Sequence, residues 1–171
     1  PVQLSDFEGF CLLESDPNVQ KTLFGIVRTA DQTRERLERF IADWEKDGFG
    51  QWAFRTHDDD DFVGLCGLFH GRVPHVDGLE VGYVLRPRYW GRGLATEMTT
   101  AVVRFAFEMR REPALCAMLQ PDNAASVRVL EKSGLRRGPD FVYRDELPSA
   151  SFAVTRDEWL AASAVSDTRA P

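Results

Sequence analysis

Apolar residues recur with two different spacings along the chain. Alternation at every second position is typical of a half-buried strand, and spacing of three to four residues is typical of a helix with one buried face. The predicted strands are residues 52–56, 62–69, 81–85, 114–119, 141–147 and 151–155. The predicted helices are residues 5–15, 29–47, 94–109 and 123–133, with another from residue 155. Helices that alternate with strands and hairpins predict a mixed α/β sheet covered on both faces.

Local capping signals set the expected ends of these helices. Three begin at a capping-box pattern, in which Ser or Thr is followed three residues later by Glu or Gln. These patterns are Ser5–Glu8, Thr29–Gln32 and Thr155–Glu158. Asp16-Pro17 is expected to end the first helix and Gly48 to cap the second. In the stripe Leu94, Met98, Ala101, Val102, Phe105 and Met109, helical spacing places all six residues on one face.

Turn residues mark the remaining connections. The run Asp58–Asp61 between two predicted strands is expected to be a solvated hairpin loop, because the spacing of an EF-hand calcium loop is absent. The final two strands are expected to join around Pro148-Ser149, and Asp122 or Asn123 is expected to cap the helix that Gly134 ends.

Length and composition are those of one globular domain over residues 1–171. The hydrophobic fraction is 43% and the net charge is −6, which argues against binding to a nucleic-acid backbone. A membrane helix would need about 20 consecutive apolar residues, and the chain has no such run. Cys11, Cys66 and Cys116 stand in apolar surroundings, so we expect reduced core thiols, no metal and a cytoplasmic location.

A glycine turn precedes the central helix. Pro87 ends the strand, Gly91 and Gly93 flank the cationic Arg92, and helical spacing begins at Leu94. Free N–H groups at a helix start, where the helix dipole is positive, form an anion site that suits phosphate or pyrophosphate. The alternative is that the glycines only make a tight turn. The Rossmann fingerprint fails at Thr96, and the lysine of the P-loop is absent.

Two motifs together resemble one family. Arg88-x-x-Gly91-x-Gly93-x-Ala95 resembles the pyrophosphate signature of the GNAT superfamily of N-acetyltransferases. Asn123-x-x-Ser126-x-x-Val-Leu-Glu-Lys-Ser-Gly-Leu resembles the segment that follows the fifth strand in that family. The branch that it looks most like contains ribosomal-protein-alanine N-acetyltransferases. The similarity covers nearly the whole chain, although the first strand of the family is largely missing. A trimmed chain, or numbering from an internal residue, is therefore expected.

The resemblance implies a GNAT-like fold and an acetyl-CoA site. The sheet would be mixed, mostly antiparallel and splayed between the fourth and fifth strands, with helices on both faces. Acetyl-CoA would bind in that cleft as co-substrate, pairing its pantetheine arm with the exposed edge of Val84 and Leu85. Its pyrophosphate would meet the N–H groups of the turn and the charge of Arg88. The alternative is that Arg88 and Arg92 are solvated surface residues. The implied cofactor-binding residues are Val84, Leu85, Arg88, Gly91, Arg92, Gly93, Leu94, Ala95, Asn123 and Ser126.

Candidate catalytic groups follow from the same resemblance. Glu80 is the candidate base for the amine, with substrate binding or a structural hydrogen bond as the alternative. Ser126 is the candidate donor to the departing thiolate, with a bond to its own helix as the alternative. The Leu85 N–H would stabilise the tetrahedral intermediate. His70 and His75 are weaker candidates. Many members carry a tyrosine acid where this chain has Leu130, so that role is unfilled here.

The expected function is direct acetyl transfer from acetyl-CoA to a primary amine, with a peptide or protein N-terminus favoured. Small amines such as polyamines or aminoglycosides are the second option. A non-catalytic acyl-CoA-binding module and an unrelated phosphate-binding α/β protein are the rivals from other classes. The sequence leaves a monomer or a homodimer open.

Overall fold

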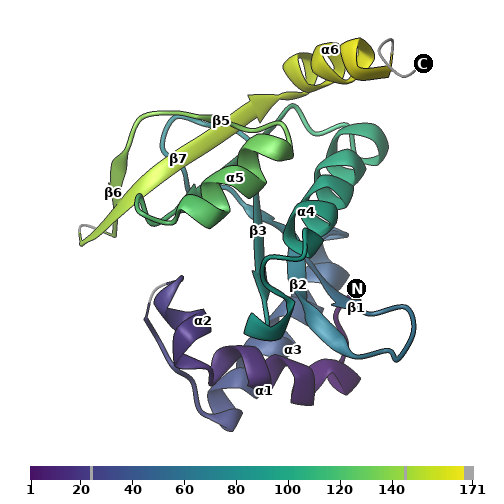
Figure 1. The fold of residues 1–171 in the computed structure, drawn as a ribbon, viewed down its shortest axis with the longest axis vertical. Helices are drawn as coiled ribbons and strands as arrows, with labels where there is room; N and C mark the ends of the chain where they lie inside the picture. The colour runs from purple at the N-terminus through teal and green to yellow at the C-terminus, as the bar shows by residue number, and fades with distance from the viewer. Residues whose placement is uncertain (24, 145, 168–171) are drawn as a thin grey trace. The chain divides into compact units, whose positions relative to one another are not determined.

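The computed structural model describes residues 1–167 except 24 and 145. Its strands are β1 Gln51–Arg55, β2 Phe62–His70, β3 Leu79–Leu85, β4 Ala114–Leu119, β5 Arg136–Arg137, β6 Phe141–Tyr143 and β7 Leu147–Thr155. Its helices are α1 Phe7–Glu14, α2 Pro17–Lys21, α3 Ala30–Asp47, α4 Leu94–Arg104, α5 Ala124–Lys132 and α6 Arg156–Asp167 (Figure 1). Short 3₁₀ turns cover Leu4–Asp6 and Pro87–Tyr89, and a π-helical turn covers Phe105–Met109.

The strands form a mixed sheet. Hydrogen-bonded neighbours follow the order β1-β2-β3-β4-β7-β5, and β6 pairs with β7. The pair β3/β4 is parallel, whereas β1/β2, β4/β7, β5/β7 and β6/β7 are antiparallel. This confirms the predicted mixed, mostly antiparallel sheet with helices.

Contacts divide the chain into two compact units. Unit 1 is Pro1–Phe69 with Gly82–Thr99, and unit 2 is His70–Val81 with Thr100–Pro171. The division falls inside β3 and α4, so the glycine turn belongs to unit 1 and Glu80 to unit 2. The single domain predicted for residues 1–171 stays a prediction.

The core of unit 1 joins the first helices to β2. Helix α1 packs on α3 (Figure 1), and the buried cluster is Val2, Phe10, Leu13, Val19, Leu37, Phe62 and Leu65. The Thr29–Gln32 capping box is present, and Gly48 ends α3 with φ 68°. Both features were predicted from the sequence. They end the helix properly because the Thr29 hydroxyl accepts a free N–H at its start and Gly48 tolerates the positive φ at its close.

The start of the chain differs from the prediction. The Asp6 carboxylate, not the Ser5–Glu8 pair, accepts the N–H bond at the first turn, from Gln3 at 2.8 Å. Asp6 is 1% exposed and also binds Arg55 at 2.5 Å, so it caps the turn and links it to β1. The short helix α2 begins at Pro17 and was not predicted, although Pro17 and the Asp16 cap are ordinary helix-start residues.

In unit 2 the long strand β7 is the centre of the sheet. It pairs with β4 from Ala114/Thr155 to Leu119/Ala150, while β5 and β6 also pair with it. Helix α5 lies beside this strand group in Figure 1. The described core includes Phe107, Leu115, Leu130, Leu135 and Phe152, each at most 2% exposed. At the end of β7, Thr155 and Glu158 cap α6 as predicted, with the Thr155 N–H donating to Glu158 at 2.9 Å.

Two expectations about unit 2 are wrong. Pro148 and Ser149 lie inside β7, opposite Val142 and Phe141, rather than in the connecting turn. Met109 does not share the buried helix face, because its side chain is 75% exposed. Ala101 of the same stripe is exposed as well, and the buried face runs through Val102, Val103, Ala106 and Phe107. The predicted face was therefore displaced before the π-helical turn begins at Phe105.

Candidate functional site

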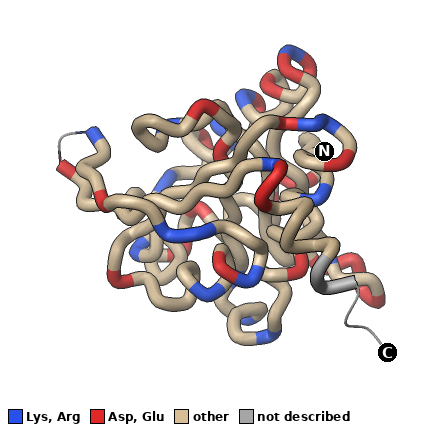
Figure 2. The backbone as a smooth tube through the Cα atoms, turned by 90° about the horizontal axis from the view of Figure 1, so that it is seen from above, with Lys and Arg blue, Asp and Glu red and all other residues tan. Residues whose placement is uncertain are grey.

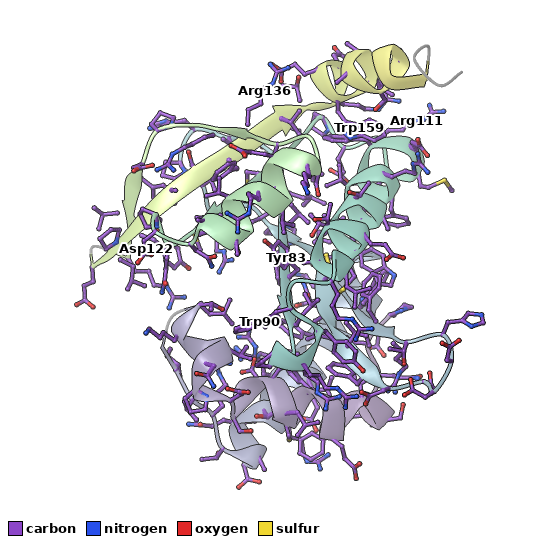
Figure 3. All side chains as sticks on the ribbon, in the orientation of Figure 1. Tyr83, Trp90, Arg111, Asp122, Arg136 and Trp159 are labelled. Atoms are coloured by element: carbon purple, nitrogen blue, oxygen red, sulfur yellow. The ribbon has the colours of Figure 1, made fainter. Side chains whose placement is uncertain are left out.

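The turn between β3 and α4 has the backbone geometry of an anion cradle. Gly91 and Gly93 have φ values of 72° and 81°, in the left-handed region that side chains disfavour. A Cβ at either glycine would meet no atom within 4 Å, so the turn faces open space. Trp90, labelled in Figure 3, links the residue before the turn to the end of β3, because its indole N–H donates to the Leu85 carbonyl at 2.9 Å.

Helix α4 begins directly after this turn and supplies its N–H donors. The Glu97 N–H donates to the Gly93 carbonyl at 3.1 Å, which closes the first helical turn. Helix geometry therefore leaves the N–H groups of Leu94, Ala95 and Thr96 without an acceptor inside the helix. With the positive end of the helix dipole, these donors fit a pyrophosphate or another phosphate group.

Three arginines surround a buried tyrosine beside the turn. Tyr89 is 2% exposed, and the guanidinium carbons of Arg86, Arg88 and Arg92 lie 5.9, 5.1 and 5.5 Å from its ring centroid. Asp61 binds Arg86 at 2.9 Å and Arg88 at 3.2 Å, and it accepts the Tyr89 hydroxyl. The Asp61 cluster, defined as these five residues, keeps an excess of positive charge.

The hydrogen bonds of the cluster also set its protonation. The bond from the Tyr89 hydroxyl, followed by the Arg86 bond and charge, lowers the pKa of Asp61 against the opposing effect of burial. The same hydroxyl bond raises the pKa of Tyr89. Asp61 is therefore an anion and Tyr89 a neutral donor at neutral pH.

Glu80 in unit 2 is buried and held by one arginine. It is 3% exposed, and Arg72 binds it through Nη2 to Oε1 at 2.6 Å and Nε to Oε2 at 3.0 Å. The Arg72 backbone N–H donates to Oε2 at 3.2 Å. Arg72 also lies 5.6 Å from the Tyr143 ring and reaches its hydroxyl at 3.5 Å. Burial lowers the pKa of Arg72, but its bond to Glu80 and the charge of that carboxylate raise the pKa overall.

The cysteine thiols are protonated near neutral pH and therefore poor nucleophiles. Cys66 and Cys116 are 0% exposed, and burial raises their pKa values to about 12 and about 11. Burial also raises the pKa of the partly buried Cys11. Because the thiolate is the reactive form, these thiols are inert near pH 7.

Asn123 and Ser126 lie at the start of α5. The Asn123 side chain accepts the Ser126 N–H at 3.1 Å and caps the helix, as predicted. Ser126 is half-buried. Leu130, at the position of the family's tyrosine acid, is 2% exposed and belongs to the core.

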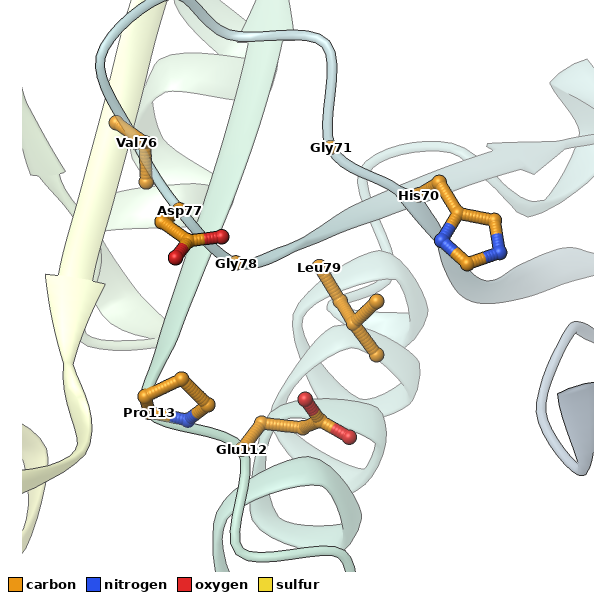
Figure 4. A pocket seen from close by; sticks show the side chains of 8 residues that line it. All are labelled: His70, Gly71, Val76, Asp77, Gly78, Leu79, Glu112 and Pro113. Carbon is orange, nitrogen blue, oxygen red and sulfur yellow. The ribbon is translucent and has the colours of Figure 1, made fainter.

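A separate cavity lies among the loops of unit 2. It has a volume of about 350 Å³ and is lined by His70, Asp77, Glu112 and Pro113 with neighbouring residues (Figure 4). Glu112 is bound by Arg110 at 2.9 Å. His70 thus lines this cavity, and His75 is exposed with φ 63°.

The predicted residues fall into two groups. Those at the end of β3 and the start of α4, from Val84 to Ala95, belong to unit 1, whereas Glu80, Asn123 and Ser126 belong to unit 2. Sequence reasoning missed Asp61, Arg72 and Tyr143. Asp61 was hidden in an acidic run, and Arg72 lies in a loop without periodicity. Neither position carries a pattern that would have marked it.

The described part of the chain holds neither a cluster of metal-ligating side chains nor a helix fit to cross a membrane. No group of three or more His, Cys, Asp or Glu side chains there is placed to hold a metal ion. Of the helices in residues 1–167, none combines the length and apolarity needed to cross a bilayer.

Comparison with known proteins identifies the family. The Acetyltransferase (GNAT) domain family matches residues 1–136. The chain is 31% identical to the uncharacterized protein YkkB of Bacillus subtilis (strain 168) over 126 residues, covering 74% of this chain and 73% of YkkB. It is 28% identical to the probable N-acetyltransferase YjcK of the same strain, over 80% of this chain and 78% of YjcK.

Solved structures share the fold at low identity. A GNAT-family acetyltransferase from Bacillus anthracis has a TM-score of 0.77 at 24% identity, covering 91% of this chain and 92% of its own. Spermidine N-acetyltransferase from Vibrio cholerae, solved with CoA and spermine, gives 0.76 at 15% over 92% and 94%. Ribosomal-protein-S5-alanine acetyltransferase from Vibrio fischeri gives 0.73 at 14% over 91% and 90%. The chain belongs to the GNAT family of acetyl-CoA-dependent N-acetyltransferases.

Proposed function

We propose that this chain transfers the acetyl group of acetyl-CoA directly to the α-amine of a peptide or protein N-terminus. The observation that carries the proposal is the glycine turn, which combines two left-handed glycines and open space with helix-start N–H groups that have no acceptor inside α4. That geometry suits the pyrophosphate of acetyl-CoA, with Arg88 and Arg92 adding charge. Val84 and Leu85 would pair with the pantetheine arm.

Proton chemistry supports the proposed acceptor class. The attacking amine must be neutral, and an α-amine with a pKa of about 8 is about one-tenth neutral at pH 7. A lysine amine at about 10.4 lies about 3.4 pH units too high, a cost of about 4.6 kcal/mol. An α-amine therefore needs only a modest base.

Glu80 is proposed to receive the amine proton, directly or through water. Arg72 already donates to both of its oxygens, but two carboxylate oxygens have about four acceptor positions, so capacity remains. Arg72 would orient the carboxylate for this task. Because one positive charge already balances Glu80, the pair favours a singly charged amine over a polyamine.

The remaining steps use a backbone donor and a hydroxyl. The amine nitrogen attacks the thioester carbon, and the Leu85 N–H would stabilise the resulting oxyanion. The carbon–sulfur bond then breaks, and the Ser126 hydroxyl would donate a hydrogen bond to the departing thiolate. The amine proton leaves through Glu80 to solvent, and solvent protonates the thiolate. The inert thiols of Cys66 and Cys116 favour this direct route over an acetylated enzyme.

Fold likeness does not choose among acceptors, because the spermidine and S5-alanine enzymes match with similar TM-scores. Small amines are therefore the alternative substrate class. The unfilled tyrosine position keeps a non-catalytic acyl-CoA-binding module as the rival function. Family membership removes the unrelated phosphate-binding protein.

Steady-state thiol release separates these options. Acetyl-CoA is offered with a panel of N-terminal peptides, their N-terminally blocked forms with free lysines, polyamines and aminoglycosides. The proposal expects turnover with free N-termini and little with blocked peptides. Turnover confined to polyamines or aminoglycosides would overturn the acceptor class. CoA binding without turnover on any amine would favour the module.

A further inference from the structure

Asp61 differs from the other members of its acidic run. Asp58 is fully exposed and Asp60 is 83% exposed, whereas the Asp61 side chain is 28% exposed. The Asp61 backbone is fixed from both sides, because its N–H donates to the Thr56 hydroxyl and its carbonyl accepts the Thr56 N–H, each at 2.9 Å. These two bonds to Thr56 fix the backbone from which the Asp61 side chain projects.

The Asp61 carboxylate holds three groups on the segment that precedes the glycine turn. Oδ1 and Oδ2 accept from Arg86 Nη1 at 2.9 and 3.1 Å, and Oδ2 lies 3.2 Å from Arg88 Nη1. Oδ2 also accepts the hydroxyl of the buried Tyr89. Within residues 86–89, one carboxylate therefore anchors two guanidinium groups and the tyrosine hydroxyl.

This anchoring acts on the arginine that the anion site needs. Arg88 is 58% exposed, so without a partner its long side chain would sample many rotamers. Arg88 and Arg92 both lie against the Tyr89 ring, 5.1 and 5.5 Å from its centroid, and the hydroxyl of that ring donates to Asp61. Preorganised donors bind an anion more tightly than mobile ones, because less side-chain entropy is lost on binding.

We propose that Asp61 is a positioning residue for acetyl-CoA binding, acting through Arg88 and Tyr89 beside the glycine turn. The inference rests on the proposed binding of acetyl-CoA at that turn, and on no property of the acceptor. By charge alone, a carboxylate beside an anion site would weaken anion binding by repulsion. Orientation of Arg88 is the effect that prevails.

The test titrates CoA into the full chain by calorimetry at fixed salt. Asp61→Asn keeps an oxygen for the Tyr89 hydroxyl but loses the charge that holds Arg88. We expect its Kd for CoA to rise about tenfold, the scale of one charge-assisted hydrogen bond. Asp58→Asn makes the same chemical change in the same run, at a fully exposed position, and should leave the Kd unchanged. Asp61→Glu, which keeps the charge, should bind CoA within about threefold of wild type.

A double variant separates positioning from general damage. If Asp61 acts through Arg88, Asp61→Asn added to Arg88→Ala should weaken CoA binding by less than twofold beyond Arg88→Ala alone. Full additivity, or binding by Asp61→Asn as tight as or tighter than wild type, overturns the inference and leaves the proposed function intact. Wild-type protein that binds no CoA overturns both. If circular dichroism shows that the Asp61→Asn protein is unfolded, Asp61→Glu replaces it in the comparison. The Kd of Asp61→Glu for CoA must then lie within threefold of wild type, or the inference falls.

Discussion

Arg72 and Glu80 form a two-point ion pair in which Nη2 lies 2.6 Å from Oε1 and Nε lies 3.0 Å from Oε2. The carboxylate is buried, whereas the guanidinium side chain remains 39% exposed. The pair therefore places a compensated charge in the interior at the start of β3. It also gives Glu80, the candidate base, a fixed orientation.

Removal of Arg72 should cost stability. Arg72→Gln leaves the buried Glu80 carboxylate without its cation, and we expect unfolding free energy to fall by about 1–3 kcal/mol, below the range for fully buried pairs because water can reach the site. Urea unfolding measures this loss. Arg137→Gln is the matched control, since Arg137 binds Asp140 at 2.9 Å on the surface, and it should cost under about 0.5 kcal/mol. Equal effects of the two variants would contradict a special role for the Arg72 pair.

Glu80→Gln should separate turnover from CoA binding. The amide keeps the shape of the side chain but takes up no proton, so thiol release should fall about 100-fold, within the usual range for a lost general base. CoA affinity should stay within about threefold. Initial rates from pH 6 to 9 provide the check. A rate equal to wild type across that range would remove Glu80 from proton transfer and leave it a structural partner of Arg72.

Ser126→Ala tests the hydrogen bond to the leaving thiolate. We expect kcat to fall about tenfold, since bonds to charged groups are worth about 1.5–3 kcal/mol, while the KM for acetyl-CoA changes little. Ser163→Ala removes a hydroxyl that bonds the Trp159 carbonyl within α6, and it should leave kcat unchanged. A matching fall in both variants would point to general destabilisation.

Stability should decline in alkaline solution through the buried thiols. Burial raises the pKa of Cys66 from an ordinary value of 9.0 to about 12. Between these values the unfolded chain releases the thiol proton and the folded chain keeps it, so unfolding free energy falls by up to about 1.4 kcal/mol per pH unit for this group. Below pH 9 the contribution is fully present. Urea unfolding from pH 8 to 10.5 should show a shallower slope in Cys66→Ala than in wild type. Parallel slopes would contradict the assignment.

Local signals in the sequence predicted most of the fold. The Thr29–Gln32 box, the Gly48 cap and the strand 114–119 are all present, because each depends on residues close in sequence. The errors arose where tertiary contacts determine a strand boundary or the buried face of a helix. Pro148 lies inside β7 because it pairs with Val142 of β6, and Met109 is exposed because the buried face of its helix follows Val103, Ala106 and Phe107 instead.

The same distinction holds for the site. The glycine turn was recognisable because left-handed backbone and free N–H groups require glycine at fixed spacing. Asp61 and Arg72 were not, since their roles depend on partners 25 to 28 residues and 8 residues away, without periodicity between them. The roles given to Glu80 and Ser126, the oligomeric state and the cytoplasmic location stay predictions.

The most direct test of the central claim is calorimetric titration of CoA into wild type, Gly93→Asp and Gly25→Asp. Gly93 and Gly25 have φ values of 81° and 73° with open space around both, so the two substitutions impose similar backbone strain and add the same charge. Only Gly93→Asp places that charge among the N–H groups at the start of α4. The account predicts that Gly93→Asp abolishes CoA binding while Gly25→Asp binds like wild type. Binding retained by Gly93→Asp would show that the turn is not the pyrophosphate site.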